Sequence, residues 1–329
     1  MTLACALLGL NVGVHAAPVA PAAVVTFDTT PRAGQHQRQL LDIQAVMKMR
    51  AEPGADASEA QRAKIAQGND TMVRMGPMKM TMRMQQTLQV GQPDADGWLP
   101  LTIGNTSQGG QMEVGGKTTP LPTPKQGNLA FTARFNPKDF AFELKGTEGS
   151  PEATELMRKQ GSALMTEALQ LYKALSQRPM KVGDSVELPL NMAMPMALPG
   201  GNSQLQSKVR YTLARVERGV AHFDLNMDMD ITTEAPMPAR PASAASAAPE
   251  EAASAPAAAP LVMRMKMQGR ATGNSSMRLA DRLPLANTLT MDMQMTADMP
   301  DNGRMLMDMT LVMKAKGESL AKPAAKAKP

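Results

Sequence analysis

The stretch from Met78 to Val90 reads Met-Lys-Met-Thr-Met-Arg-Met-Gln-Gln-Thr-Leu-Gln-Val. Its methionine, leucine and valine residues fall on even positions, and its polar residues fall mainly on odd positions. A period of two predicts a β-strand with one apolar face and one polar face. At about 3.3 Å per residue the strand would run roughly 40 Å, about twice the usual length. A strand this long has to bend or twist, so we expect a curved sheet.

The same alternation returns along the rest of the chain, with an apolar residue at every second position. The segments that share it are 41–51, 129–135, 140–144, 186–198, 209–213, 221–231, 261–267, 289–295 and 305–313, and shorter strands are predicted at 98–103 and 111–114. Pro189 and Pro195 cannot donate to a strand ladder, so 186–198 is expected at a sheet edge. We predict a mainly β (α+β) fold, in which a long curved antiparallel sheet forms a half-barrel or barrel-like shape with a methionine-lined inner face.

One long amphipathic helix is predicted over 151–177. Ser150 can cap its N-terminus, Pro151 suits its first turn, apolar residues recur at spacings of three and four, and Pro179 ends it. We expect this helix to lie on the open edge or the concave face of the sheet. By contrast, the polar segment 52–70 is expected to be a loop with a helical turn over 58–66.

The N-terminus predicts export. The apolar run 3–14 is too short to span a membrane, and Val14-His15-Ala16 places small residues where signal peptidase cleaves. No basic residue precedes the run, which favours a start codon further upstream. Cys5 lies inside the run and not at its end, so a lipid anchor is not expected. Cleavage after Ala16 would leave a chain without cysteine, which suits the periplasm.

The composition also predicts how the chain is divided. The predicted parts are a signal peptide at 1–16, a Pro/Ala spacer at 17–23, a β-rich domain at 24–317 with a disordered Ala/Pro insertion at 235–260, and a disordered tail at 318–329. The β-rich part is either one domain or two similar halves, 24–149 and 179–317, joined by the helix 151–177. Both arrangements remain open at this stage.

Charge and aromatic content exclude several classes of partner. The formal net charge is +5 and is spread along the sequence, and aromatic residues make up 3% of the chain. Nucleic-acid binding usually needs a basic stripe and stacking rings, so no nucleic-acid partner is expected. One tryptophan and two tyrosines cannot form the aromatic girdles of an outer-membrane barrel, so we do not expect an integral membrane protein. The oligomeric state cannot be predicted.

Methionine is the unusual residue, with 31 in the chain. One hypothesis is a concave face lined by these adaptable side chains that binds a lipid, an acyl chain or another hydrophobic small molecule. The alternative for the same residues is soft-metal binding, because thioethers suit Cu(I) and Ag(I), and the structural alternative is a solidly packed interior. No histidine lies among the Met-x-Met runs, and the runs are spread over many strands, so no metal site is predicted. The predicted ligand-lining residues are Met78, Met80, Met82, Met84, Met192, Met194, Met263, Met265, Met291, Met293, Met307 and Met309.

No catalytic site and no cofactor are predicted. Gly183-Asp184-Ser185 matches the nucleophile motif of the GDSL-type hydrolases, but that family needs a histidine further along, and none follows His222. Asp184 and Ser185 are therefore expected to start a strand. Acidic residues such as Asp228, Asp292 and Asp308 alternate with basic ones, which favours cross-strand ion pairs over a cation site.

The segment Pro179-Met180-Lys181-Val182-Gly183-Asp184-Ser185-Val186 resembles a Pro…Val-Gly-Asp-Ser-Trp signature of a family of uncharacterised exported bacterial β-rich proteins. Val186 stands where that signature has tryptophan. The resemblance implies export and a mostly β fold, and it implies no site. The predicted shape is also similar to the half-barrel carriers of lipids and lipoproteins in the periplasm.

Together these observations predict a non-enzymatic periplasmic protein that binds a hydrophobic ligand or an envelope partner through its concave face. The alternative function is binding of Cu(I) or Ag(I), or buffering of oxidants, by exposed methionines.

Overall fold

The computed structural model describes residues 24–28, 30–121, 128–148, 169, 173–174, 176, 178–193, 202–236, 262–299 and 303–321. Twelve strands form one antiparallel sheet. They are β1 (His36–Pro53), β2 (Met78–Val90), β3 (Leu99–Val114), β4 (Lys117–Pro120), β5 (Asn128–Asn136), β6 (Ala141–Glu148), β7 (Ser185–Ala193), β8 (Asn202–Glu217), β9 (Val220–Pro236), β10 (Val262–Arg278), β11 (Leu283–Met299) and β12 (Gly303–Ser319).

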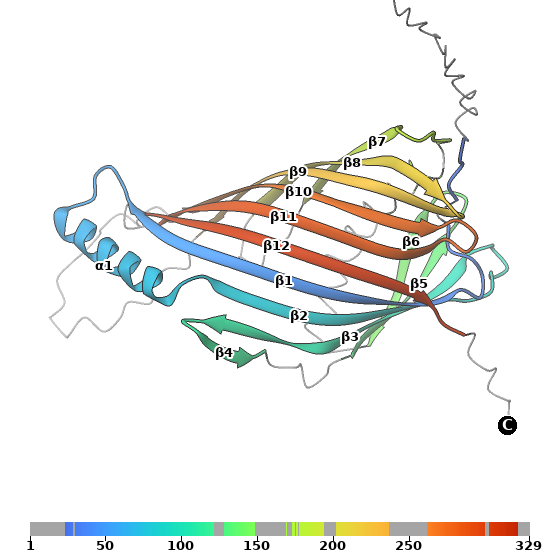
Figure 1. The fold of residues 1–329 in the computed structure, drawn as a ribbon, viewed down its shortest axis with the longest axis horizontal. Coiled ribbons are helices and arrows are strands. Elements are labelled where there is room, and N and C mark those ends of the chain that lie inside the picture. The colour runs from blue at the N-terminus through green and yellow to red at the C-terminus, as the bar shows by residue number, and fades with distance from the viewer. Residues whose placement is uncertain are drawn as a thin grey trace, which may run out of the picture.

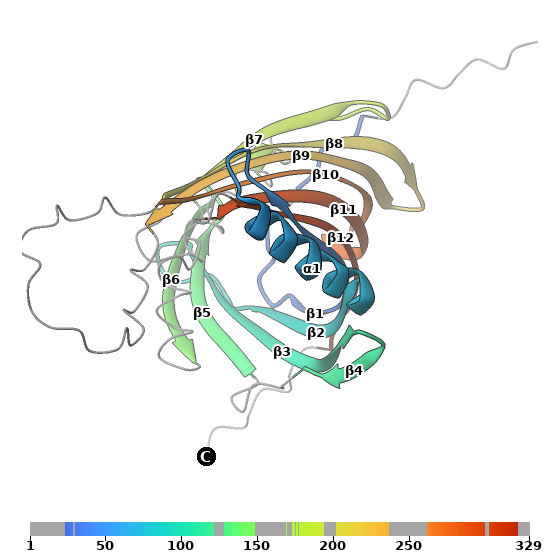
Figure 2. The ribbon, with the colours of Figure 1, turned by 90° about the vertical axis from the view of Figure 1, so that its left-hand side faces the viewer.

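The sheet is strongly curved. Its strand order is β6-β5-β3-β2-β1-β12-β11-β10-β9-β8-β7, with β4 paired to β3. Seen end-on, the strands follow a C, with β5 and β6 on one arm and β7 on the other (Figure 2). No pairing joins β6 to β7 within the described strands. The predicted fold class, a mainly β half-barrel of long antiparallel strands, is therefore confirmed.

Several strand predictions are confirmed and one is wrong. The observed bounds of β2 are the predicted 78–90, and β7 lies at the edge of the sheet, as expected from Pro189. The two short strands predicted at 98–103 and 111–114 are one strand, β3, which stays paired with β2 across a register shift at Arg83/Met84. A bulge lets a ladder continue where the alternation in the sequence breaks.

The described part of the predicted Ala/Pro insertion is strand. β9 runs to Pro236 and β10 starts at Val262, and these two residues lie opposite each other. Residues 237–261 lie outside the described residues, as do the predicted signal peptide, spacer and most of the predicted tail. The division of the chain into domains remains a prediction.

In the segment 52–70, predicted as a loop with a helical turn over 58–66, the helical turn is part of a longer helix, α1 (Glu59–Met75), and the loop is limited to the residues between β1 and Ser58. The Ser58 hydroxyl accepts a hydrogen bond from the Gln61 backbone amide, and the Gln61 side chain accepts one from the Ser58 backbone amide, which forms a reciprocal capping box. No residue of α1 is buried. A helix that buries no face needs no apolar stripe, so the sequence lacks the periodicity that would predict its full length. The Asn69 side chain bonds both backbone groups of Ala51, at 2.8 and 2.7 Å, which fixes α1 against β1. Figure 1 shows α1 at one end of the sheet.

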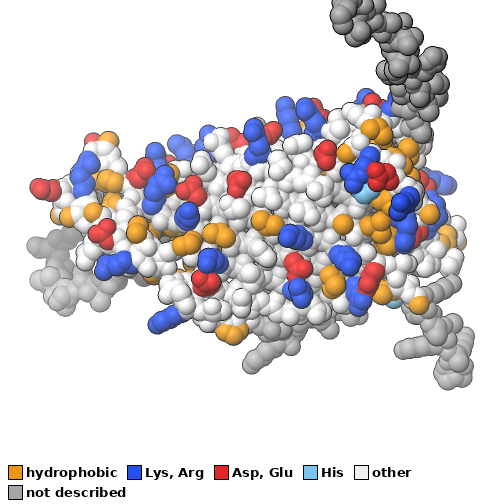
Figure 3. All heavy atoms as spheres, viewed as in Figure 1, with side chains coloured by type: hydrophobic (Ala, Val, Ile, Leu, Met, Phe, Trp, Pro, Cys, Tyr) orange, Lys and Arg blue, Asp and Glu red, His pale blue; other side chains and the backbone are white. Residues whose placement is uncertain are grey.

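The convex face of the sheet is polar and charged. Lysine, arginine, aspartate and glutamate are scattered over it (Figure 3). Cross-strand ion pairs form there, such as Arg83–Asp42 at 2.6 Å and Arg270–Asp228 at 3.0 Å. The ion pairs expected from the alternating charges are therefore confirmed, and the apolar side chains of the same strands point to the concave face.

The concave face is packed shut at the end opposite α1. One buried cluster there is built on Leu213 and Phe223 of β8 and β9, and a second on Val90 and Phe135 of β2 and β5. The N-terminal arm crosses this end, because the Phe27 ring packs at a tilt against the Phe223 ring with centroids 5.1 Å apart, and Val25 pairs with Met180. We call this the closed end and the α1 side the open end.

The helix predicted over 151–177 lies outside the described residues except at Leu169, Lys173, Ala174 and Ser176, which have helical backbone. Leu169 belongs to the cluster on β2, β3 and β5, and Ala174 packs against the cluster on β7 to β9. Two positions five residues apart thus contact both arms of the C, which brings the two arms together at the closed end.

Candidate functional site: a methionine-lined concave face

Two rows of methionines lie side by side on the concave face near the open end. In the first row Met78, Met47, Met309 and Met293 are opposite one another on β2, β1, β12 and β11. In the second row Met49, Met307, Met295 and Met267 are opposite one another on β1, β12, β11 and β10. Each row therefore holds four methionines on four neighbouring strands. Directly opposed residues have Cβ atoms about 4.5–5.5 Å apart, so these side chains contact their neighbours.

The two rows are only partly covered. Met293 is buried, at 8% exposure, whereas the other seven methionines are half-buried. This contrasts with the closed end, where Leu213 and Phe135 are 0% and 1% exposed. The rows therefore present apolar surface that packing within the described residues does not fill.

The second half of α1 completes a pocket at the edge of these rows. Met72, Val73 and Met75 face Met47, Met49 and Met78 around a volume of about 250 Å³. Five of its ten lining residues are methionines. The Gly115 amide donates to the Met75 carbonyl at 2.9 Å, and Gly76 ends the helix at a φ of 69°. These contacts place the end of α1 at the mouth of the half-barrel, as Figure 2 shows. The volume is slightly below that of common ligand pockets, about 300–1,000 Å³.

Gly269 on β10 makes room for the methionine side chains of the two neighbouring strands. Gly269 lies between Met293 of β11 and Met229 of β9, and a Cβ atom on it would lie 2.8 Å from Met293 Cγ and 3.3 Å from Met229 Cε. Because real Cβ atoms rarely come so close, a larger residue here would push the methionine side chains aside. Glycine at this position therefore lets both methionines lie over the strand.

Two hydroxyl groups interrupt the apolar face. Ser207 lies opposite Met229, and Thr233 lies opposite Met265. They are 4% and 1% exposed, and neither hydroxyl oxygen has a hydrogen-bond partner among the described residues. A buried unsatisfied polar group costs about 1–3 kcal/mol, so these two hydroxyls lower the stability of this part of the sheet unless a buried water molecule bonds them.

The predicted lining residues fall into three groups. The structure places Met78, Met293, Met307 and Met309 in the two rows. Met80, Met82, Met84, Met265 and Met291 lie on the same concave face but outside the rows. Met192 and Met263 have described backbone in β7 and β10, and Met194 lies outside the described residues.

The prediction missed two kinds of residue. Met47 and Met49 were assigned to a strand but not to the site, although they alternate in the same way as Met78. Met72 and Met75 were missed because α1 was not predicted over its full length. The signal was present in Ser58 and Gln61, whose spacing is that of a capping box.

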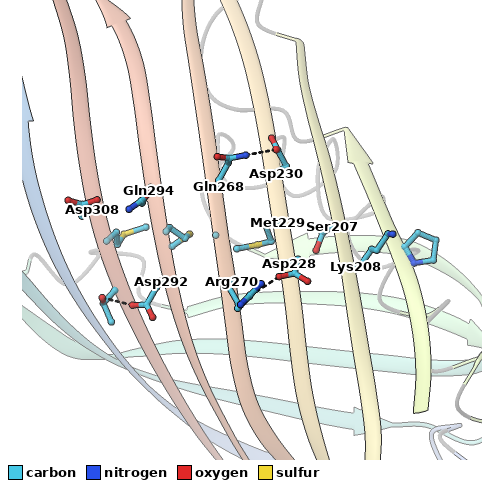
Figure 4. A pocket seen from close by; sticks show the side chains of 15 residues that line it. Ser207, Lys208, Asp228, Met229, Asp230, Gln268, Arg270, Asp292, Gln294 and Asp308 are labelled. Atoms are coloured by element: carbon cyan, nitrogen blue, oxygen red, sulfur yellow. Dashed lines mark hydrogen bonds and ion pairs between the residues drawn. The ribbon is translucent and has the colours of Figure 1, made fainter. Parts of the chain in front are cut away.

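A second hollow is an open groove of about 920 Å³ that crosses β7 to β12 (Figure 4). Charged and polar residues of these strands line it, together with Ser207, Met229, Met293 and Met309. Its charged and polar residues are paired across strands, as in Asp228–Arg270 at 3.0 Å and Gln268–Asp230 at 2.8 Å. Thr310 donates to Asp292 at 2.7 Å. The carboxylates in this groove therefore already have partners on neighbouring strands.

The Gly183-Asp184-Ser185 segment has a structural role. The Asp184 carboxylate accepts from the Lys181 amide at 2.8 Å, Gly183 has a φ of 96°, and the Ser185 hydroxyl contacts the Thr212 hydroxyl at 2.8 Å. The motif forms the tight turn that leads into β7. Met180, at the start of this turn, is completely buried beside Phe27.

Two further features bear on metals and membranes. Within the described ranges, no group of three or more histidine, cysteine, aspartate or glutamate residues is arranged to hold a metal ion. Among the same residues, no helix is both long and apolar enough to cross a membrane.

Comparisons with known proteins add no family. No protein-family model matches the chain, and a search of the curated proteins finds no significant match. Among solved structures, Pseudomonas aeruginosa OpdQ is 6% identical, with 87% of this chain and 99% of that chain covered and a TM-score of 0.26. Pseudomonas aeruginosa OccK5 (OpdH) is 7% identical, with 88% and 100% covered and a TM-score of 0.23. At such TM-scores the likeness supports no argument about function.

Proposed function

We propose that this protein is a non-enzymatic, exported carrier that holds a hydrophobic ligand, such as an acyl chain, against the methionine rows of its concave face. The observation behind the proposal is the contrast between the two ends of the half-barrel. Phenylalanine, leucine and the N-terminal arm fill the closed end, while half-buried methionines leave apolar surface at the open end. Unbranched, flexible side chains suit ligands of variable shape.

The open end also offers a route for entry. The pocket between α1 and the first row leads onto this surface, and Val73 at its rim is 79% exposed. Burying an acyl chain here would remove apolar area from water at about 25 cal/mol per Å².

Export is part of the same proposal. It is supported by the apolar run 3–14, by the small residues at Val14 and Ala16, and by the absence of cysteine after Cys5. The resemblance around Pro179–Val186 to exported β-rich proteins agrees with it. Mass spectrometry of the protein recovered from a periplasmic fraction tests it, with a new N-terminus at Ala17 as the expected result.

The binding proposal is tested by native mass spectrometry of the purified mature protein, followed by titration with a fluorescent long-chain fatty acid. We expect a co-purifying lipid mass or saturable binding of the probe. Met309→Lys should abolish binding because it places a charge in the first row. Thr310→Lys places the same charge on the convex face of the same strand and should bind as the wild type does.

A second variant covers the case in which Met309→Lys does not fold. Met307→Trp stays apolar but fills space in the second row, so it should weaken binding at least about tenfold, or about 1.4 kcal/mol. Far-UV circular dichroism verifies the fold of each variant. A wild-type protein that carries no lipid and shows no saturable binding would refute the carrier proposal.

A further inference from the structure

We propose that the methionines around the α1 pocket form a thioether site for a soft monovalent cation, Cu(I) or Ag(I). The inference goes beyond the carrier proposal and does not depend on it. It starts from register: the Met-x-Met runs are far apart in the sequence, yet Met47 lies directly opposite Met78 on one side and Met309 on the other. Three thioethers from three strands therefore meet in one row.

The donors also come from two directions. A row on a sheet presents all its sulfur atoms from one side, which cannot surround an ion. Here Met72 and Met75 of α1 line the same pocket as Met47, Met49 and Met78. An ion in this pocket would have thioethers from the sheet on one side and from the helix on the other. Flexible methionine side chains can adjust their sulfur positions to such an ion.

The chemistry of the pocket selects soft ions of low charge. Thioethers prefer Cu(I) over hard cations such as Mg²⁺ and Ca²⁺, which need oxygen ligands. Among the residues that the structure describes, Lys48 is the only charged residue that lines the pocket, and no carboxylate of this part of the chain lines it. A doubly charged ion would lose its hydration shell here without a compensating anion, at a much higher cost than a monovalent ion.

The sulfurs are within reach of solvent. Met47, Met49, Met72 and Met78 are half-buried, and Met75 is 43% exposed. A methionine that only filled a core could be replaced by leucine with little change in stability, usually below about 1.5 kcal/mol. Leucine keeps the apolar volume and removes the donor, so it separates coordination from packing.

The test uses the full mature protein, titrated with Ag(I) in nitrate buffer by calorimetry and with Cu(I) without oxygen against a chromogenic chelator. We expect wild type to bind one ion. The triple variant Met47→Leu/Met49→Leu/Met78→Leu removes three thioethers that line the pocket and should lose affinity by at least about tenfold for each thioether removed. The matched control Met82→Leu/Met84→Leu/Met313→Leu changes three methionines of the same face outside the pocket and should bind as wild type does.

A second measurement needs no variant. Ag(I) should protect Met47, Met72 and Met78 of the wild type from oxidation by hydrogen peroxide, as read by peptide mass spectrometry, and leave Met82 unprotected. Absence of ion binding by wild type, or equal affinity in both triple variants, would overturn the proposal. Fatty-acid binding should survive in the site variant because leucine is apolar, so failure of the metal site and failure of the carrier proposal give different results.

Discussion

Arg282 is the residue that fastens the N-terminal arm to the closed end. Its backbone has a φ of 60°, a conformation that costs most residues roughly 1–2 kcal/mol. Its side chain is 14% exposed, forms an ion pair with Asp28, and donates to the Thr30 carbonyl and, at 2.6 Å, to the Thr30 hydroxyl. Burial lowers the pKa of the Arg282 guanidinium, and the Asp28 charge opposes that change. Three polar contacts from one side chain thus hold the arm beside the β10–β11 turn.

We predict that Arg282→Met destabilises the protein by about 1.5–3 kcal/mol at neutral pH, because the hydrogen bonds lost involve a charged group. Urea unfolding measures the change. The exposed pair Arg304–Asp298, 3.3 Å apart, supplies the control, and Arg304→Met should cost less than about 1 kcal/mol. Equal effects of the two substitutions would contradict the role given to Arg282.

The same contact predicts a dependence on pH. Burial raises the pKa of Asp28, but hydrogen bonds from Thr30 and the charge of Arg282 outweigh it, so the pKa lies below its ordinary value. A lowered pKa in the folded state means that the stabilisation is present at neutral pH and is lost as the carboxylate is protonated. The stability difference between wild type and Arg282→Met should therefore shrink below about pH 4. A constant difference between pH 7 and pH 3 would rule this out.

At the scale of the element, α1 depends on local contacts. Its residues are not buried, so its stability comes from the capping box at Ser58, from Gly76 and from the two bonds between Asn69 and Ala51. Isolated helices of this length are marginal in water. We therefore expect α1 to open more easily than the strands it joins, β1 and β2, and the pocket to open with it.

Ser58→Ala should remove about 1 kcal/mol of helix stability. Hydrogen exchange of the α1 amides should become faster, while exchange in β1 and the urea midpoint of the whole protein should not change. Ser58→Asp keeps an acceptor at the cap and serves as the control. An equal increase of exchange in β1 and α1 would show that the helix is not an independent unit.

At the scale of the whole molecule, one sheet joins residues from both ends of the chain. β1 pairs with β2 on one side and with β12 on the other, through seventeen residue pairs from Gln37↔Ser319 to Pro53↔Gly303. The two predicted halves therefore share their central ladder. Their separation would break this seventeen-pair ladder.

We predict that the mature protein unfolds in one cooperative transition. Trp98, the only tryptophan of the sequence, lies in the N-terminal half. The Arg134 Cζ atom lies 4.4 Å from the centroid of its ring, so tryptophan fluorescence reports on the structure of that half. Far-UV circular dichroism reports on the whole sheet. The two urea midpoints should coincide. Separate midpoints would instead support two domains.

Local pattern allowed the strands to be predicted, but of α1 it indicated only a helical turn over 58–66. The alternation around Met78–Val90 is a property of neighbouring residues, so it identified the strand and its apolar face. A second local property, the missing amide donor of Pro189, predicted that β7 lies at an edge of the sheet. Alternation did not predict two other features. The full length of α1 was missed because the helix has no apolar stripe, and β3 was divided into two strands because a bulge interrupts its period.

The sequence by itself determined that the chain forms long antiparallel strands with methionines on one face, because side-chain alternation follows directly from strand geometry. Only the tertiary structure decided which methionines meet. Met47, Met78 and Met309 are brought together by register between strands far apart in the sequence, and Met72 and Met75 by the position of α1. Register and curvature depend on non-local pairing, and no run of neighbouring residues encodes them.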